Sequence, residues 1–225
     1  MSRILVVTAV AVEARGLARC LGLARVVSCR EHRYGGPGVD LVCGGPRGRR
    51  LSGLAPLARH AALVVSAGTC GALAPHLAEG DLVVPEVVLS PAGHRHAVPE
   101  RRGLAATGTL LTVADVVQTP EGKARLWRQT AALAVDMESS MIIEWAATIG
   151  VPAAVVRGVA DTAARGVPAA FAEALDEHGR VRVGRVMGIV IARPRAFSEA
   201  LALRRGTSAA LRSVAAALRV LTRSR

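Results

Sequence analysis

Aromatic residues and lysine are almost absent from this chain of 225 residues. Phe, Trp and Tyr make up 2% of the sequence, and Lys123 is its one lysine. Proteins that bind single-stranded nucleic acid usually combine a basic groove with aromatic side chains on which the bases stack. The scarcity of aromatics therefore argues against nucleic acid as a partner, although the formal net charge is +12. That charge leaves an anionic membrane or a phosphorylated substrate open.

The sequence also lacks a disulfide or metal-binding framework. None of its four cysteines forms a C-x-x-C pair, and they are Cys20, Cys29, Cys43 and Cys70. This pattern fits a reducing compartment. No metal and no bound cofactor are predicted. The chain begins on a strand pattern rather than a signal peptide, and no apolar run approaches the roughly 18–20 residues that cross a bilayer. We expect a cytoplasmic protein, with peripheral contact at the inner membrane face left open.

Strand and helix patterns alternate along the whole sequence. Apolar runs predict buried strands at residues 4–10, 39–43, 61–66, 82–89, 108–117 and 151–159. Helical spacing marks residues 12–21, 51–59, 120–130, 136–149, 181–193 and 197–221. Continuously apolar strands are typical of a sheet with helices on both faces. We therefore expect one α/β domain over residues 1–225, with a mixed, mostly parallel central sheet flanked by helices.

The last segment, residues 197–225, predicts a basic amphipathic helix. Leu211, Val214, Leu218 and Leu221 fall on one face, and arginines occupy the rest of the helix. A helix of this kind packs on the core or lies in the interface of an anionic membrane. The sequence leaves both alternatives open.

Polar residues follow three of the predicted strands, where ligands collect in α/β folds. The loop after the strand at 61–66 contains Gly68 and Thr69, and glycine there allows the backbone to approach a ligand. Glu138 lies near a predicted helix start and can accept both hydroxyls of a ribose; Asp136 can equally cap that helix. Asp161 is a candidate general acid, because burial raises the pKa of a carboxyl group, or alternatively a helix cap.

Together these motifs resemble the nucleoside phosphorylase/nucleosidase superfamily, which includes the methylthioadenosine/S-adenosylhomocysteine nucleosidases. The resemblance is carried by Val12–Arg15, Ala67–Gly71 with Gly80-Asp81, Val135–Ser139 and Val156–Asp161. The Glu-Ala-Arg start and the tail segment Val183–Arg195 look most like the hopanoid-associated phosphorylases. The resemblance implies a homo-oligomeric enzyme that cleaves the N-glycosidic bond of a purine nucleoside. Its substrate would be lipid-linked adenosylhopane, from which adenine is released in hopanoid biosynthesis.

The same resemblance implies roles for individual residues. Asp161 matches the general acid that protonates adenine at N7, and Glu13 matches the carboxylate that orients a nucleophilic water. Glu138 and Met137 match the pair that binds the ribose.

Four further positions match the surroundings of the nucleophile and the base. Thr69 and Gly68 match the nucleophile region, together with Arg15 as a candidate cation, and Val117 and Ala160 match the base pocket.

Two residues leave the co-substrate open between inorganic phosphate and water. Ser66 stands where hexameric purine nucleoside phosphorylases carry a phosphate-binding arginine, and Glu13 would repel phosphate. Arg15, Arg47 or Arg49 could supply the cation that a phosphate needs. The alternative substrates are of the methylthioadenosine/S-adenosylhomocysteine or futalosine type. A regulatory relative that binds a nucleoside without turnover is the alternative outside the enzymes.

Overall fold

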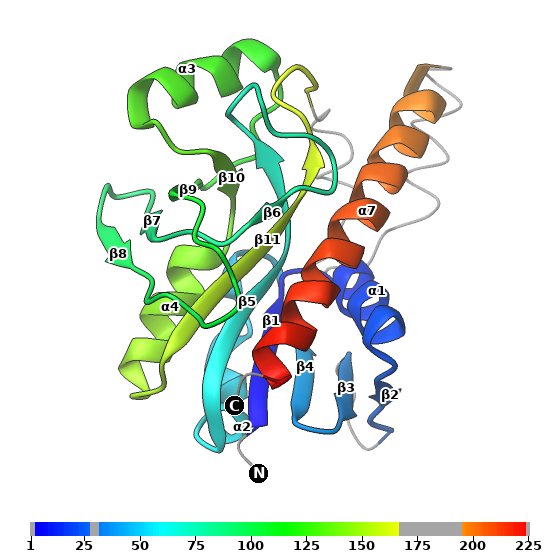
Figure 1. Cartoon of the computed structure of the whole chain (residues 1–225), viewed down its shortest axis with the longest axis vertical. Coiled ribbons are helices and arrows are strands. Elements are labelled where there is room, and N and C mark those ends of the chain that lie inside the picture. The colour runs from blue at the N-terminus through cyan, green and yellow to red at the C-terminus, as the bar shows by residue number, and fades with distance from the viewer. Residues whose placement is uncertain (1–2, 28–31, 167–194, 224–225) are drawn as a thin grey trace.

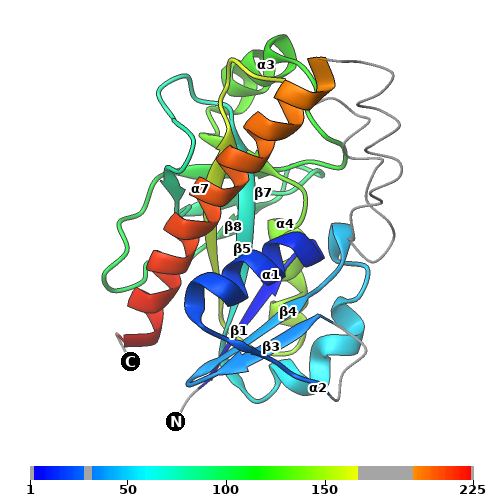
Figure 2. The same ribbon diagram turned by 90° about the vertical axis from the view of Figure 1, so that its right-hand side faces the viewer.

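The computed structural model describes residues 3–27, 32–166 and 195–223, and their arrangement is shown in Figure 1. Eleven strands of these residues form one sheet, with helices against both of its faces (Figures 1 and 2). The predicted α/β class with a mixed sheet is confirmed. In the described part of the chain, no helix is long and apolar enough to cross a membrane. The predicted helix at residues 181–193 lies outside the described residues.

The four central strands run parallel. In spatial order they are β4 (Val39–Cys43), β1 (Arg3–Thr8), β5 (Ala61–Ala72) and β11 (Ala153–Asp161). Thr8 pairs with Cys43 at the end of β1, and Val7 pairs with Ser66. Because these strands share a direction, the loops that follow β1 and β4, the later half of β5 and the end of β11 lie toward the same edge of the sheet.

Short strands extend the sheet on both sides, and several of them run antiparallel to their neighbours. They are β2 (Ala24–Arg25), β3 (Arg33–Gly36), β6 (Leu82–Val83), β7 (Val87–Leu89), β8 (Arg95–Ala97), β9 (Thr109–Thr112) and β10 (Ala134–Asp136). β5 is twice as long as the predicted strand at 61–66, because its later residues pair with β11 on one edge and with β10 on the other. This extension brings β10 beside the ends of the central strands.

Helices cover the two faces of β1, which explains why that strand is apolar from Ile4 to Val7. Ile4 and Val6 pack in the cluster under α1 (Ala11–Leu21) and α7 (Arg195–Arg223). Leu5 and Val7 face the other way, toward α2 (Ala55–Ala58) and α4 (Ser139–Thr148). Alternating side chains along the strand thus enter two different cores.

The structure confirms one predicted helix start and corrects two other helix predictions. α3 (Pro120–Thr130) begins where expected, and the Thr119 side chain accepts a hydrogen bond from the backbone N–H of Gly122 at 3.1 Å. The prediction of a helix from Asp136 is wrong, since Asp136 ends β10 and pairs with Thr112 of β9; α4 starts at Ser139. The segment predicted as a helix at 51–59 is a 3₁₀ turn, Leu51–Leu54, followed by the single turn of α2.

The apolar face of α7 packs on the core. Leu211, Val214, Leu218 and Leu221 are buried there, so this face is not available to insert into a membrane. The helix approaches β11 closely: a Cβ on Gly158 would lie 2.5 Å from the carbonyl oxygen of Ala210, and one on Gly206 would clash with the carbonyl oxygen of Ala160. Backbone therefore meets backbone where α7 crosses the strand that ends at Asp161.

Candidate functional site

Glu13 lies in the first turn of α1, and its carboxylate is fixed by four hydrogen bonds. Oε1 accepts from the backbone N–H of Thr69 at 2.7 Å and from Oγ1 of Thr69 at 2.8 Å. Oε2 accepts from the N–H groups of Ala9 and Val10 at 3.2 and 3.4 Å. The side chain is only 4% exposed. The structure thus brings together Glu13 and Thr69, which the sequence analysis had grouped near the nucleophile.

Gly68 lies between two charged side chains. A Cβ at this position would be 2.7 Å from Oε1 of Glu13 and 2.8 Å from Nη1 of Arg157. Only a residue without a side chain leaves both groups where they are. Gly68 therefore separates a carboxylate from a guanidinium, and its predicted approach to a ligand stays a prediction.

Arg157 is the central cation of the site, although no motif in the sequence predicted a role for it. Its side chain is buried within β11, where Nη2 lies 2.8 Å from Oδ2 of Asp136. Nη2 also donates to Oγ of Ser66 at 2.8 Å and to Oγ of Ser139 at 3.1 Å. Burial disfavours the charge, but Asp136, Glu138 and Glu13 outweigh it and raise the pKa of Arg157 above its ordinary value. A charged residue inside a strand that is otherwise apolar was the feature that could have revealed it.

Asp136 has two functions in the structure. Its Oδ2 accepts the backbone N–H of Ser139, the first residue of α4, at 3.0 Å, and its Oδ1 accepts from Oγ1 of Thr112 at 2.8 Å. The capping alternative for Asp136 is thereby confirmed. The same carboxylate is the ion-pair partner of Arg157, so it links the start of α4 to β11.

Glu138 lies next to this network, just before α4. It is 8% exposed, and its Oε1 accepts from the backbone N–H of Arg47 at 3.2 Å. Burial raises the pKa of Glu138 to about 7, and the charges of Asp136 and Glu13 act in the same direction. Arg157 and the Arg47 N–H oppose this shift. Glu138 thus titrates near neutral pH.

The raised pKa of Glu138 predicts a pH dependence of stability. Below the unfolded-state pKa of this group its contribution to folding is fully present, and it is lost as the pH rises through about 7. We expect the wild-type free energy of unfolding to fall between pH 4.5 and pH 7.5 by on the order of 2 kcal/mol more than that of Glu138→Gln. Urea unfolding of both proteins at the two pH values measures this difference. Identical pH dependences would contradict the buried environment of Glu138.

Asp161 ends β11 and is paired with Lys123 of α3. Lys123 Nζ makes an ion pair with Oδ2 of Asp161 and donates to the carbonyl oxygen of Thr162 at 2.8 Å. Burial raises the pKa of Asp161 above its ordinary value despite the opposing charges of Lys123 and Arg165. No helix begins in the described residues that follow, 162–166, so the helix-cap alternative for Asp161 has no support there.

The remaining predicted site residues differ in how deeply they are buried. Met137 is half-buried between Asp136 and Glu138, and Ala160 is buried next to Asp161. Val117 is half-buried in the loop before α3, where it packs against a core cluster. Arg15 is exposed on α1, two residues after the buried Glu13. Two residues along a helix correspond to about 200°, so Arg15 lies on a different side of α1 from Glu13, and its role in the nucleophile region stays a prediction.

The other candidate cations are also occupied or exposed. Nη2 of Arg47 forms an ion pair with Oδ1 of Asp115 at 2.8 Å, and both side chains are well exposed. Arg49 is exposed in the same loop. Among the described residues, this buried cluster therefore contains the acidic side chains of Glu13, Asp136 and Glu138 around the guanidinium of Arg157. Such a site stabilises positive charge and repels anions.

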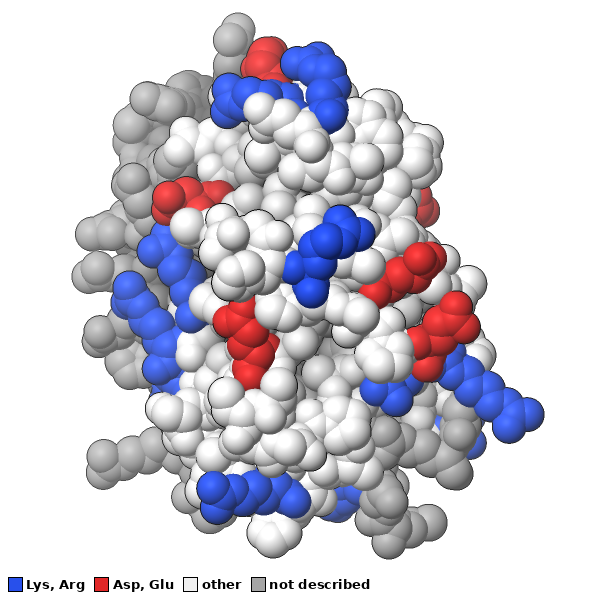
Figure 3. Space-filling view, turned by 90° about the vertical axis from the view of Figure 1, so that its left-hand side faces the viewer, with Lys and Arg blue, Asp and Glu red and all other residues white. Residues whose placement is uncertain are grey.

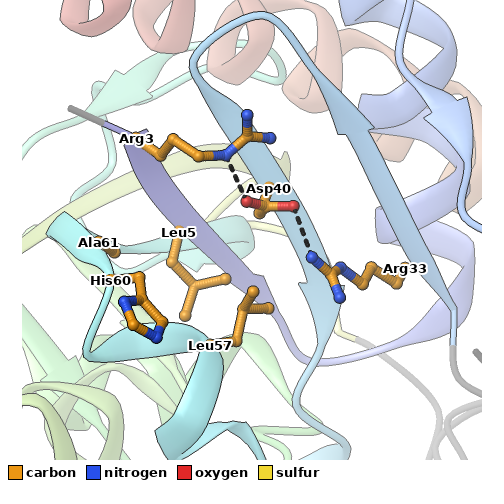
Figure 4. A pocket seen from close by; sticks show the side chains of 7 residues that line it. All are labelled: Arg3, Leu5, Arg33, Asp40, Leu57, His60 and Ala61. Carbon is orange, nitrogen blue, oxygen red and sulfur yellow. Dashed lines mark hydrogen bonds and ion pairs between the residues drawn. The ribbon is translucent and has the colours of Figure 1, made fainter. Parts of the chain in front are cut away.

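A cavity of about 220 Å³ lies elsewhere, at the opposite edge of the sheet (Figure 4). It is lined by Arg3, Leu5, Arg33, Asp40, Leu57, His60 and Ala61. Asp40 accepts hydrogen bonds from Arg3 at 2.7 Å and from Arg33 at 3.1 Å. Burial opposes ionisation of Asp40, but these two arginines outweigh it and lower its pKa. These contacts tie β1, β3 and β4 together, and the cavity holds none of the predicted site residues.

The described residues form no basic band on the face that carries α3, β8 and α4. Figure 3 shows arginines and acidic residues interspersed there on a largely uncharged surface. This distribution gives no support to a groove that follows a nucleic-acid backbone on this face.

Comparisons with known proteins connect this geometry to a family. A family model described as "Phosphorylase superfamily" matches residues 100–192, which include Glu138 and Asp161. No curated protein sequence matches the chain.

Solved structures share its fold over almost the full length. The 5′-methylthioadenosine nucleosidase of Arabidopsis thaliana is 15% identical with a TM-score of 0.70, over 100% of this chain and 97% of that one. An MTAN variant from Helicobacter pylori with 5′-methylthioadenosine in its active site is 14% identical with a TM-score of 0.68, over 99% of both chains. The futalosine hydrolase of Helicobacter pylori is 14% identical with a TM-score of 0.67, over 99% of this chain and 97% of that one. Residues 100–192 thus resemble the phosphorylase superfamily in sequence, and the fold of the chain agrees with that of these nucleosidases.

Proposed function

We propose that this chain cleaves the N-glycosidic bond of a purine nucleoside, with water as the nucleophile and no cofactor. The observation that carries the proposal is the buried cluster of Glu13, Asp136 and Glu138 around Arg157. As a purine leaves, C1′ of the sugar gains positive charge. Fixed negative groups in a buried site stabilise that charge without reorganisation.

The roles of the proposed catalytic residues follow from their positions. Asp161 protonates the leaving base at N7, a step typically worth about 10²–10⁴-fold in rate. Its buried carboxyl, with a raised pKa, suits a proton donor. Glu13, fixed by Thr69, orients the attacking water.

The ribose and the base lie between these two groups in this proposal. Glu138 binds the 2′ and 3′ hydroxyls, with Met137 against the sugar. Val117 and Ala160 line the base pocket.

Water is favoured over phosphate as the nucleophile because the buried arginine of the site already donates its hydrogen bonds to other side chains. A bound phosphate needs fixed, uncommitted donors. Arg157 lies beside Ser66, but Asp136, Ser66 and Ser139 already accept its hydrogens. A phosphate would also face the carboxylate of Glu13.

The substrate we propose is adenosylhopane, on the strength of the sequence resemblance to hopanoid-associated phosphorylases. Methylthioadenosine and futalosine are the competing substrates, because enzymes for both share the fold. A lipid-linked substrate would bring the protein to a membrane surface, and exposed arginines of α7 such as Arg205 and Arg212 are available for electrostatic contact. Homo-oligomerisation is part of the same proposal.

The test is release of the free base from adenosylhopane, methylthioadenosine and futalosine, each with and without inorganic phosphate. We expect release without phosphate, and release from adenosylhopane at the highest kcat/KM. A strict requirement for phosphate would overturn the choice of nucleophile. Preference for another of the three would overturn the substrate. No release from any of them would overturn the activity and favour a nucleoside-binding protein instead.

The position of Gly68 gives a further prediction. We expect Gly68→Ala to lower kcat by about tenfold to a hundredfold, because the new methyl group displaces Glu13 or Arg157 from positions that catalysis requires within about 1 Å. The matched control is Gly53→Ala, where a Cβ would meet nothing within 4 Å. Steady-state kinetics of both variants measure the effect. Equal activity of the two variants would show that the spacing at Gly68 has no part in turnover.

A further inference from the structure

The only lysine of the chain is buried against the proposed general acid. Lys123 is 1% exposed. It lies one turn into α3, a helix whose start is fixed by the Thr119 cap and by Pro120. Its ammonium group contacts Oδ2 of Asp161 and the carbonyl oxygen of Thr162. Burying an ammonium is costly unless it is paired and hydrogen-bonded, and these two contacts supply both conditions.

The other charged groups near Asp161 largely offset each other. Arg165 and Glu79 form an ion pair, and they act on the pKa of Asp161 in opposite directions. The thiol of Cys70 on β5 is uncharged at neutral pH, because burial raises its pKa. Within the described residues, Lys123 is therefore the cation next to Asp161 that has no second carboxylate as a partner.

The two oxygens of Asp161 are not equivalent. Oδ2 is held by Lys123, whereas Oδ1 has no hydrogen-bond partner among the described residues. An oxygen that faces an ammonium is a poor place for a proton, since the cation stabilises negative charge there. The proton of the neutral carboxyl therefore belongs on Oδ1.

We propose that Lys123 is a positioning residue for the general acid, which directs the proton of Asp161 to Oδ1 and stabilises the carboxylate that remains after transfer. The proposal rests on the proposed function. In the transfer step the Oδ1–H bond breaks and an N7–H bond forms on the leaving purine, while the electron pair stays on the carboxylate. Lys123 keeps all its protons. The attacking water releases one proton to solvent, and Asp161 regains one before the next turnover.

A positioning role for Lys123 predicts a change in the pKa of Asp161 when the cation is removed, whereas a side chain that only fills space would not change it. Removing the cation should raise the pKa of Asp161 by about one to three units, the usual size of a close opposite charge. The acid then stays protonated to higher pH, but it gives up its proton less readily. We therefore expect the alkaline limb of the kcat profile to move upward in pH while the plateau value of kcat falls.

The experiment compares variants that remove or keep the charge. Lys123→Met and Lys123→Gln remove it, and the second keeps a hydrogen-bond donor in case the first does not fold. Lys123→Arg keeps the cation, and Arg165→Gln removes an exposed cation that is already paired with Glu79. In both neutral variants we expect the alkaline limb of the kcat profile to lie about one to three pH units higher than in the wild type. Their plateau kcat should be lower by about tenfold, with KM within twofold of the wild-type value. Lys123→Arg should restore the wild-type limb, and Arg165→Gln should move the limb upward by less than either neutral variant, because its exposed charge is screened by solvent.

A second readout does not depend on turnover. The carboxyl resonance of ¹³C-labelled Asp161, assigned by its loss in Asp161→Asn, reports the pKa of this group directly. A higher pKa in the neutral variants supports the proposal, and an unchanged pKa overturns it whether or not a nucleoside is cleaved. A higher pKa with an unchanged kcat profile also overturns it. An inactive wild type would overturn the proposed function alone, because the titration of Asp161 is still measured.

Discussion

Asp161→Asn is expected to cleave its nucleoside about 10²–10⁴ times more slowly than the wild-type protein. An amide has the size of the carboxyl group but cannot donate a proton to N7, so the purine would leave as an unprotonated anion. Substrate binding should change little, because the proton transfer belongs to the transition state rather than to the ground state. Single-turnover release of the base, together with equilibrium binding of the substrate, separates the two effects.

Asp115→Asn is the matched control for this variant. Asp115 is exposed and pairs only at the surface with Arg47, so the same chemical change should leave turnover within about twofold. If Asp161→Asn kept near wild-type turnover, the assignment of Asp161 as the acid would be wrong. The Lys123–Asp161 pair would then have to be explained as a structural ion pair.

Arg157→Met is expected to produce the largest loss of stability, about 3–5 kcal/mol. The change leaves the buried carboxylate of Asp136 without its ion-pair partner, and it removes the donor shared by Ser66 and Ser139. The free energy of unfolding in urea measures the loss. The variant should also be inactive, because Glu13 and Glu138 lose the cation that offsets their repulsion.

Two further variants test whether the loss comes from burial of the pair. Arg47→Met breaks an exposed ion pair with Asp115 and should cost no more than about 1 kcal/mol. The double variant Arg157→Met/Asp136→Asn removes both buried charges and should recover part of the stability, since an uncompensated charge costs more than a missing pair. Additive losses in the double variant would contradict a direct coupling between Arg157 and Asp136.

The sequence predicted the central layers of the fold because their apolar patterns reflect burial on both faces. β4 and α3 match their predicted ranges, and the strand pattern at the start of the chain corresponds to β1. β5 was predicted to end at Ser66, since the glycines at 68 and 71 are typical of turns. The strand continues to Ala72 because β11 and β10 supply hydrogen-bond partners for its backbone. Pairing with distant strands thus outweighed the local preference.

The candidate site was predictable as a set of residues but not as a network. The structure brings Glu13 next to Thr69, and it places Glu138 beside Asp136, as their motifs indicated. Arg157 and Lys123 were missed because their partners are far away in sequence: Ser66 lies 91 residues from Arg157, and Asp161 lies 38 residues from Lys123. Such contacts depend on the order of strands in the sheet, which no single motif contains.

The contact between α7 and β11 places the C-terminal helix directly against the strand that ends at Asp161. Gly158 and Gly206 bring backbone against backbone, so no flexible side chain lies between the helix and the strand to absorb a displacement. A tilt of α7 would press on the carbonyl group of Ala160, which directly precedes Asp161. The packing of α7 therefore bears directly on the backbone that holds the carboxyl group of Asp161.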